Sequence, residues 1–358
     1  MSKCVSLIAI VSLLALVSCA GAPETSAPAG AIALQGAGAT FPNPIYSKWF
    51  SEYNKKYPNV KIDYQSIGSG GGIKQITEQT VDFGASDAPM KEDQMKALPK
   101  PILHIPTVLG AVVVIYNLPS LSGELKLNSD VLVAIFLGEI KKWNDPKIAA
   151  INPDLKLPDK DIGVVHRSDG SGTTAIFTEY LSKVNPKWAE KVGQGTSVNW
   201  PVGIGGKGNE GVTSQVKQIE GTIGYTELVY ALQNKLSYAS LQNKAGKFVT
   251  PTLDAVTAAA ASAATQMPED LRVSITDAPG DAAYPISSYT YLLVYQDMEN
   301  STKAQTLAKF LSWAMHEGQQ QAKELGYAPL PPEVVTKAEG KIKSITTKGT
   351  PALPPQAQ

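Results

Sequence analysis

The chain has 358 residues, with 32 Lys and Arg against 32 Asp and Glu, so its formal net charge is zero at pH 7. No run of basic residues stands out, which argues against the basic face that nucleic-acid binding usually needs. The three histidines and two cysteines form no ligand pair at the spacing of a metal site, so we expect no metal and no cofactor.

Residues 1–18 have the layout of a secretory signal peptide. Lys3 gives a positive start, and residues 5–17 are almost wholly apolar. That run is about 13 residues long, whereas spanning a bilayer takes roughly 20. Residues 16–19, Leu-Val-Ser-Cys, match the lipobox of bacterial lipoproteins, which implies cleavage before Cys19 and a lipid on its sulfur. The alternative is an ordinary signal peptide with an incidental cysteine.

The two ends of the mature chain have the composition of unstructured segments. Residues 19–30 are rich in Ala, Pro, Gly and Ser and lack large apolar side chains, which predicts a flexible, lipidated tether. Residues 346–358 are expected to be a loose tail. More than 300 residues lie between these ends, too many for one typical core and suited to two. Removal of the leader takes Cys4 away, so no disulfide is expected and the core alone must hold the fold.

Helical and strand patterns alternate along the chain, which predicts an α/β fold. Residues 44–57 have large apolar side chains every four residues, which predicts an amphipathic helix. The nearly continuous apolar run 108–116 predicts a buried central strand. The other predicted helices are 73–78, 129–137, 172–184, 209–219 with Asn209 as its N-cap, 256–265, 302–315 with Ser301 as its cap, and 331–343. The other predicted strands are 60–67, 81–86, 162–165 and 288–295.

Three glycine and hydroxyl-rich segments precede predicted helices, at residues 36–41, 68–72 and 169–174. The first N–H groups of a helix are unpaired and carry partial positive charge. Glycine lets an anion approach the backbone, and Ser and Thr hydroxyls add donors. Each segment is therefore a candidate anion-binding loop.

The segment that starts at Arg167 is the strongest of the three. Ser171 and Thr173 offer hydroxyls, and Gly172 offers a backbone N–H. The planar guanidinium of Arg167 matches the geometry of an oxyanion, and Asp169 could hold it in place. The alternative is a well-capped surface helix with an incidental Arg–Asp pair.

Asp87 follows the predicted strand 81–86, where open α/β sheets place their ligands. A carboxylate beside an anion makes sense if the anion carries a proton, which Asp87 could accept in a hydrogen bond. Fully deprotonated sulfate would instead meet a repulsive carboxylate. The alternative reading makes Asp87 the cap of a local turn.

Other segments match a known motif in sequence but lack the structural context that the motif needs. Residues 203–208 fit G-x-G-x-x-G, but no convincing strand precedes them, so we do not expect a dinucleotide site. Ser171 lacks the glycines two positions away that a nucleophile elbow needs. We therefore expect no enzyme activity, the alternative being a phosphatase or other hydrolase.

These segments together resemble the substrate-binding proteins of bacterial high-affinity phosphate ABC transporters, over residues 36–330. The resemblance implies a two-lobed periplasmic-binding-protein fold (type II) that closes on phosphate in the inter-lobe cleft. It implies one lobe from residues 31–114 plus 284–345 and a second from 115–283. By position it implies the ligand-binding residues Thr40, Phe41 (through its N–H), Ser69, Asp87, Arg167, Ser171, Gly172 and Thr173, with Asp169 orienting Arg167.

The same resemblance implies delivery of inorganic phosphate to a membrane permease. The leader and the lipobox predict an exported protein in the periplasm or on the outer cell surface, anchored through Cys19, and in this the chain departs from the soluble periplasmic members of the family. We expect a monomer. Two alternatives of the binding class stay open. One is a receptor for another tetrahedral oxyanion such as sulfate or molybdate, and the other is a phosphate-sensing surface lipoprotein.

Overall fold

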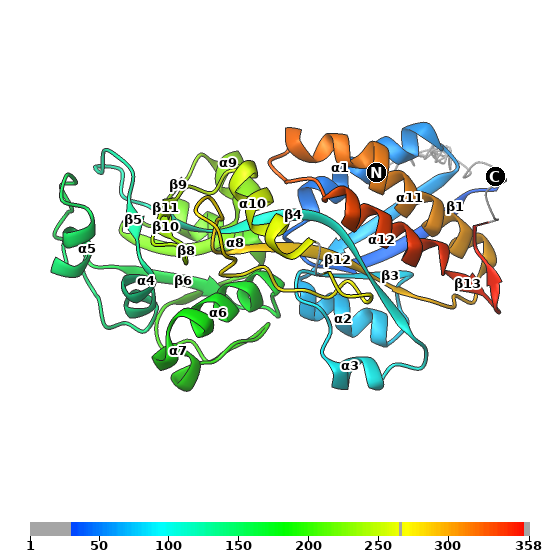
Figure 1. The fold of residues 1–358 in the computed structure, drawn as a ribbon, viewed down its shortest axis with the longest axis horizontal. Coiled ribbons are helices and arrows are strands. Elements are labelled where there is room, and N and C mark those ends of the chain that lie inside the picture. Colours follow the sequence, from blue (N-terminus) through cyan, green and yellow to red (C-terminus); the bar gives the residue numbers. More distant parts are fainter. Residues whose placement is uncertain (1–29, 265–266, 354–358) are drawn as a thin grey trace, which may run out of the picture.

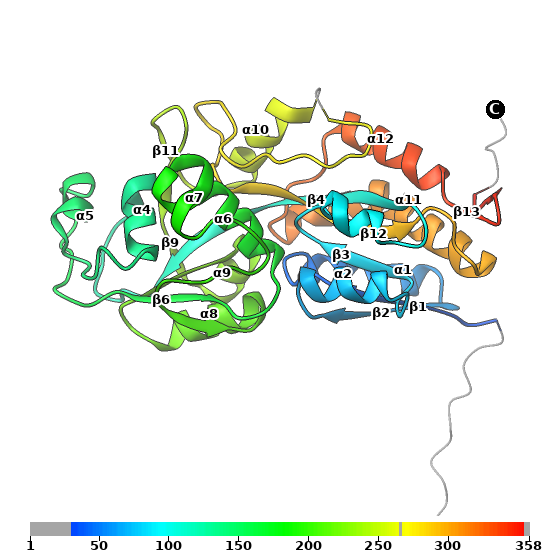
Figure 2. The same ribbon diagram turned by 90° about the horizontal axis from the view of Figure 1, so that it is seen from below.

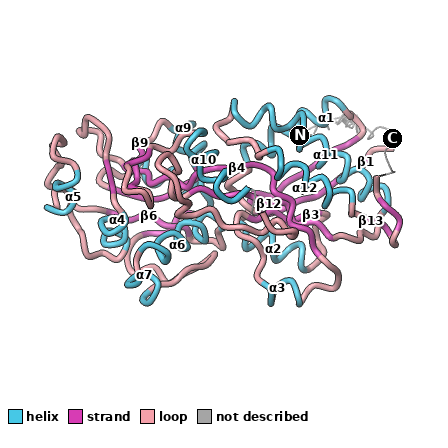
Figure 3. The backbone as a smooth tube through the Cα atoms, viewed as in Figure 1, coloured by secondary structure: helices cyan, strands magenta, loops and turns pink. Residues whose placement is uncertain are grey.

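The computed structural model describes residues 30–264 and 267–353. The predicted signal peptide, Cys19 and all of the tether except Gly30 lie outside these residues. The described chain folds into two α/β lobes that lie side by side along the long axis (Figure 1). In both lobes the strands run through the interior and the helices lie around them (Figure 3).

Lobe 1 is built from both ends of the described chain. Its strands are β1 (Ile32–Gly38), β2 (Val60–Ser66), β3 (Phe83–Ser86), β12 (Ser287–Tyr295), β13 (Thr346–Thr347) and β14 (Thr350–Pro351). Its helices are α1 (Asn43–Lys56), α2 (Ser69–Thr77), α3 (Glu92–Lys96), α11 (Ser301–Glu324) and α12 (Pro332–Lys343).

Lobe 2 comes from the middle of the chain. Its strands are β5 (Lys126–Leu127), β6 (Gly163–Arg167), β7 (Ile204–Gly206), β8 (Thr222–Glu227), β9 (Ser237–Tyr238), β10 (Ser240–Gln242) and β11 (Phe248–Val249). Its helices are α4 (Ser129–Phe136), α5 (Pro146–Ile151), α6 (Gly172–Val184), α7 (Pro186–Lys191), α8 (Gly208–Gln218) and α9 (Leu228–Asn234), and α10 (Leu253–Ala264) packs beside β4 and β12.

One long strand, β4 (Ile102–Tyr116), joins the lobes. Residues 102–111 of β4 pair antiparallel with β12 in lobe 1, and residues 112–116 pair antiparallel with β8 in lobe 2. The main sheet therefore runs through both lobes in the order β2-β1-β3-β12-β4-β8-β6-β7. The strand is visible in Figure 2 between the blue and green parts of the molecule. Fourteen of its fifteen residues are buried, as the apolar run predicts.

The direction of the strands decides where the loops meet. In lobe 1, β1 is parallel to β2 and β3, and in lobe 2, β6 is parallel to β7 and β8. The carboxyl ends of parallel strands lie at one edge of a sheet, where α/β proteins bind ligands. Each lobe thus presents its strand-to-helix loops at such an edge, and the two edges face each other.

Large aromatic side chains fill both lobes. Trp49 is fully buried in lobe 1, where its Nε1 donates to the carbonyl oxygen of Gly318 at 2.9 Å. Trp143 is fully buried in lobe 2 and donates to the carbonyl oxygen of Gly221 at 2.9 Å. Nearly all buried apolar residues of the two lobes belong to one continuous cluster. The described residues contain no cysteine, so their fold rests on this core.

Four expectations differ from the structure. Helix α2 begins at Ser69, so the glycine run that we expected to be a loop forms its first turn. Helix α11 continues to Glu324, and its N-cap is Asn300, whose side chain accepts from the Lys303 N–H. Strand β1 was not expected at all, because its small residues lack a strong apolar alternation.

The fourth difference concerns the C-terminus. Residues 346–351, expected to belong to a loose tail, form the β13–β14 hairpin, and Thr346 bonds to Gln296 and Met298. Lys348 and Gly349 both have positive φ, 52° and 78°, which is the backbone that a tight two-residue hairpin requires. Residues 354–358 lie outside the described residues. None of the described helices has both the length and the hydropathy to cross a membrane.

Candidate functional site

Three of the predicted site residues lie on the edge of lobe 1. Thr40 follows β1, Ser69 opens α2, and Asp87 follows β3. All three are buried. Gly68 has φ of +85°, and a Cβ there would lie 2.3 Å from Oδ2 of Asp169 in the other lobe, so glycine is required at this turn.

The facing edge of lobe 2 carries the other predicted residues. Arg167 ends β6, Ser171 caps α6, and Gly172 and Thr173 form its first turn. The Ser171 hydroxyl accepts from the Thr174 N–H at 3.0 Å, so its own hydrogen stays available for a ligand. Helix α6 begins at Gly172 and ends at Val184, the predicted bounds.

The two edges are in contact. The Gly70 N–H donates to the carbonyl oxygen of Gly170 at 2.8 Å across the lobes. A Cβ placed on Gly172 would lie 2.4 Å from Ser69 Oγ and 2.5 Å from Asp87 Oδ2. The structure therefore has its lobes closed and brings all eight predicted ligand-binding residues to one interface.

Asp87 is held by groups of its own lobe. Its Oδ1 accepts from the Thr290 hydroxyl at 2.8 Å, and its Oδ2 lies 3.4 Å from the Ser69 hydroxyl. Burial raises the pKa of Asp87 to about 7, although the Thr290 hydrogen bond and the charge of Arg167 act in the opposite direction. Near neutral pH this carboxyl can therefore give up or accept a proton.

Arg167 is fixed by Asp169. Its Nε donates to Asp169 Oδ1 at 2.8 Å and its Nη2 donates to Oδ2 at 2.6 Å, a bidentate pair. Burial acts to raise the pKa of Asp169, but the hydrogen bonds and charge of Arg167 outweigh it and leave that pKa below its ordinary value. Nη1 lies 3.4 Å from the Thr173 hydroxyl. Of the five guanidinium N–H groups, two have no acceptor among the described residues.

Backbone N–H groups add further donors. The Phe41 ring is fully buried, and its carbonyl oxygen accepts from the Tyr327 hydroxyl at 2.6 Å. Its N–H has no acceptor among the described residues, so the backbone is the part of Phe41 that can reach a ligand. The first N–H groups of α2 and α6 have no acceptor within their own helices. Taken together, the interface is rich in donors, and Asp87 has no cationic partner there. The nearby Glu227 is also buried without a cationic partner among the described residues, and burial raises its pKa well above the ordinary value.

Sequence reasoning missed two residues of this interface. Thr290, the donor to Asp87, lies in the middle of a buried strand, where nothing distinguishes it from a packing residue. Asn209 was expected to cap a helix, but the helix starts at Gly208 with Lys207 at the N-cap. The Asn209 side chain instead donates to the Thr40 hydroxyl at 2.7 Å.

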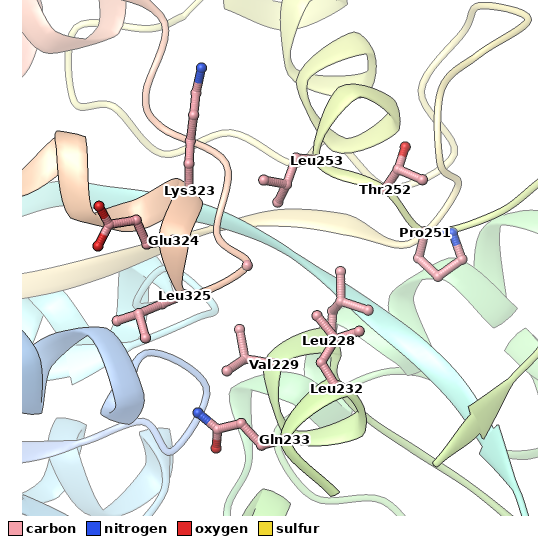
Figure 4. A pocket seen from close by; sticks show the side chains of 11 residues that line it. Leu228, Val229, Leu232, Gln233, Pro251, Thr252, Leu253, Lys323, Glu324 and Leu325 are labelled. Atoms are coloured by element: carbon pink, nitrogen blue, oxygen red, sulfur yellow. The ribbon is translucent and has the colours of Figure 1, made fainter. Parts of the chain in front are cut away.

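Two cavities lie near the junction of the lobes. One, of about 590 Å³, is lined by both lobes and by Arg272 and adjoins Asp87. The other, of about 530 Å³, lies between α9 and the end of α11, with Leu228, Val229 and Leu232 on one side and Leu325 on the other (Figure 4). The second cavity contains none of the candidate residues.

The sequence profile of the PBP superfamily domain matches residues 22–317, most of the chain. The phosphate-binding protein PstS of Pasteurella multocida (strain Pm70) is 49% identical to the chain over 312 residues, which cover 87% of this chain and 90% of that protein. The chain belongs to the PstS family of phosphate-binding proteins. The PstS of Methanocaldococcus jannaschii, 43% identical over 353 residues, covers 91% of this chain and 90% of its own length.

A solved structure extends the comparison to the fold. The phosphate-binding protein from Stenotrophomonas maltophilia superposes with a TM-score of 0.68 at 19% identity, over 86% of this chain and 93% of that one. The resemblance to this family and the two-lobed periplasmic-binding-protein fold are confirmed. The PstS relatives are named as binding proteins, not as enzymes.

Proposed function

We propose that the chain binds inorganic phosphate with high affinity between its two lobes, outside the cytoplasmic membrane, and delivers it to an ABC permease. The observation that carries this proposal is the closed interface, where hydroxyls, backbone N–H groups and one arginine lie around Asp87, a carboxylate without a cationic partner. A protonated tetrahedral anion matches that arrangement, because it has acceptor oxygens for the donors and one proton for Asp87. The names of the PstS relatives support phosphate as the anion.

Each site residue has a proposed role. Thr40, Ser69, Ser171 and Thr173 donate from their hydroxyls, and Phe41 and Gly172 donate from their backbones. Arg167 supplies positive charge and is oriented by Asp169. Asp87 accepts the hydrogen bond from the proton of the ligand.

Binding requires the lobes to move, because the phosphate is enclosed by residues of both. We propose that residues 31–114 plus 284–345 rotate as one body against residues 115–283. The chain crosses between these bodies near Val114 and Ala283. The first crossing is close to the point where the hydrogen-bonded neighbour of β4 changes from β12 to β8. Hinge closure of this kind is a common response to a ligand in a cleft.

Closure gives a direct prediction for Gly172→Ala. Its methyl group would overlap Ser69 Oγ and Asp87 Oδ2, so we expect the lobes to stop short of closure and phosphate affinity to fall by about 100-fold. Helix α6 should tolerate alanine at its first position, so the melting temperature of the ligand-free protein should not drop. Gly340→Ala in α12, where a Cβ meets nothing within 4 Å, is the control. Equal phosphate affinities for the two variants would contradict this view of closure.

The titration of Asp87 predicts how sulfate binding depends on pH. Sulfate carries no proton at neutral pH, so it requires the protonated form of Asp87. Because the pKa of Asp87 is raised to about 7, sulfate affinity should be constant well below pH 7 and fall about tenfold per pH unit above it. Phosphate brings its own proton, so its affinity should change little from about pH 7 to 9. Calorimetry with both anions across this range checks the difference.

We also propose that the chain binds phosphate without chemical turnover. His166, the histidine nearest the site in sequence, stacks on Trp200 with ring centroids 4.9 Å apart, and its Nδ1 lies 3.0 Å from the carbonyl oxygen of Arg167. It therefore does not face Ser171 as a general base would. Release of product from a chromogenic phosphate ester at a rate above that of buffer would show that this part of the proposal is wrong.

The proposed location is the periplasm or outer cell surface, with a lipid on Cys19 and the protein monomeric. The signal-like leader and the lipobox at residues 16–19 support this. Metabolic labelling with a radioactive fatty acid should mark the wild-type protein and leave Cys19→Ser unlabelled. Labelling of both proteins would refute the anchor at Cys19.

The central experiment is calorimetric titration of the protein without its first 30 residues against phosphate and sulfate. Tight binding of phosphate and weak binding of sulfate at pH 9 support the proposed function. Equal binding of the two would leave the identity of the transported anion open and would refute the role of Asp87. Binding of neither would refute the phosphate receptor itself.

A further inference from the structure

Asn209 connects hydroxyls of the two lobes within the interface. It lies in the first turn of α8 in lobe 2 and is fully buried. Its Nδ2 donates to the Thr40 hydroxyl at 2.7 Å and to the Thr173 hydroxyl at 3.3 Å. Its backbone N–H donates to the same Thr40 oxygen at 3.2 Å. One side chain therefore touches two proposed ligand-binding hydroxyls, one from each lobe.

The orientation of this amide is determined by its other end. Asn209 Oδ1 lies 3.2 Å from the Glu227 N–H and 3.1 Å from the Thr226 hydroxyl. A backbone N–H can only donate, so the oxygen of the amide must face Glu227. The NH₂ group must then face Thr40 and Thr173, and its two hydrogens match the two hydroxyls.

These contacts leave only the hydrogen of each hydroxyl available for a ligand. A hydroxyl has two lone pairs and one hydrogen. Thr40 Oγ1 accepts from the backbone and the side chain of Asn209, and Thr173 Oγ1 accepts from Asn209 and from Arg167 Nη1 at 3.4 Å. Both lone pairs of each oxygen are therefore occupied, and each hydroxyl can only donate to a ligand.

We propose that Asn209 is a positioning residue that makes Thr40 and Thr173 obligate donors and so fixes which phosphate oxygen carries the proton. This inference rests on the proposed function. Oxygens that face Thr40 and Thr173 must be unprotonated, so the proton lies on another oxygen, where Asp87 can accept its hydrogen bond. Because Asn209 and Thr40 belong to different lobes, the arrangement is complete only after closure.

Asn209→Asp tests the direction of the hydrogen bonds with almost no change of shape. A carboxylate still accepts from Glu227 and Thr226, but it also accepts from Thr40 and Thr173, which then turn their hydrogens away from phosphate. It also places a negative charge beside the anion. We expect phosphate affinity at pH 8 to fall by at least about 100-fold, and by about tenfold for Asn209→Ala, which leaves the hydroxyls free to rotate. Melting of the ligand-free variants reports whether they fold.

A double-mutant cycle separates positioning from a general structural role. If Asn209 acts through Thr40, Asn209→Ala should cost about threefold or less in a Thr40→Val protein instead of tenfold. A purely structural role would give additive effects. This cycle decides the matter even if Asn209→Asp does not fold.

Asn300→Asp is the matched control, because it adds the same charge at the N-cap of α11 and keeps the cap acceptor for Lys303. Its phosphate affinity should stay within about twofold of wild type. Additive effects in the cycle, or a phosphate affinity of Asn209→Asp within about threefold of wild type, would overturn the inference and leave the proposed function intact. Failure of the wild type to bind phosphate would overturn both.

Discussion

At pH 9, Asp87→Asn should bind sulfate about 100-fold more tightly than wild type does, while its phosphate affinity should stay within about tenfold of wild type. Wild-type Asp87 meets sulfate either ionised or protonated. Two like charges 4 Å apart repel by about 4 kcal/mol at the effective dielectric of such sites. Protonating Asp87, whose pKa is about 7, costs about 2.7 kcal/mol at pH 9, two units above the pKa. Protonation costs less free energy than repulsion, so it determines the loss of sulfate affinity, which is about 100-fold.

The asparagine removes that penalty because its geometry is preserved. Oδ1 can still accept from Thr290, which leaves Nδ2 in the place of Oδ2 as a donor to an unprotonated oxygen. Phosphate loses the acceptor for its proton but gains a donor. Asp82→Asn, which removes a charge just before β3 where Asp82 pairs with Lys303 at 2.9 Å, serves as the control and should leave both affinities unchanged. Calorimetry of the three proteins decides, and a sulfate affinity of Asp87→Asn equal to that of wild type would contradict the role of Asp87.

We expect Arg167→Ala to lower phosphate affinity by at least about 1000-fold. The substitution removes a cation whose Nη1 lies 3.4 Å from the Thr173 hydroxyl and leaves Asp169 without its cationic partner beside the anion. Truncating one partner of a buried, hydrogen-bonded charge pair costs about 2–5 kcal/mol, and here the direct attraction to phosphate is lost as well. Arg167→Lys keeps the charge without the planar guanidinium, so its phosphate affinity should lie between that of Arg167→Ala and that of wild type.

The chain offers a close control for this change, because Arg272 is its only other arginine. Arg272 pairs with Asp270 and Glu92 at the margin of the cavity that adjoins Asp87, and the side chains of these carboxylates are 49% and 64% exposed. Exposed pairs contribute about 0–1 kcal/mol, so Arg272→Ala should change phosphate affinity by no more than about threefold. Similar losses for both arginines, measured by calorimetry, would mean that overall charge rather than Arg167 determines affinity.

The sequence predicted best those parts of the molecule where local chemistry determines structure. Helix α6 had both an N-cap serine and a clear apolar pattern, and its bounds agree with the prediction. The loop at Arg167 was recognisable because donors and glycines stood between a strand pattern and a helix pattern. Thr40 was recognisable from the glycines before a helix pattern, and Asp87 from its place after a strand pattern. Helix α2 was shortened in the prediction because three consecutive glycines disfavour a helix. In the fold, Gly70 lets α2 approach Gly170 of the other lobe, and Gly72 lets it approach β1 and β3 of its own lobe.

Contacts between distant parts of the chain were beyond sequence reasoning. Thr290 reaches Asp87 because β12 is inserted beside β3, 203 residues away in sequence. Asn209 looked like a cap residue because asparagine favours that position. Its real partner, Thr40, is 169 residues away. Such pairs depend on the order of strands and on closure of the lobes, which no local pattern encodes.

The passage of β4 through both lobes has a mechanical consequence. A hinge made of loops offers little resistance to rotation. A strand that is hydrogen-bonded to neighbours on both sides of the point where it passes between the lobes resists twisting elastically. We therefore expect the proposed opening to be absorbed as twist around Ala111 and Val112, with part of the work stored in the strand. Amide protons there should exchange slowly in the open and closed states alike, so the two lobes would part by a limited angle and return without refolding any segment.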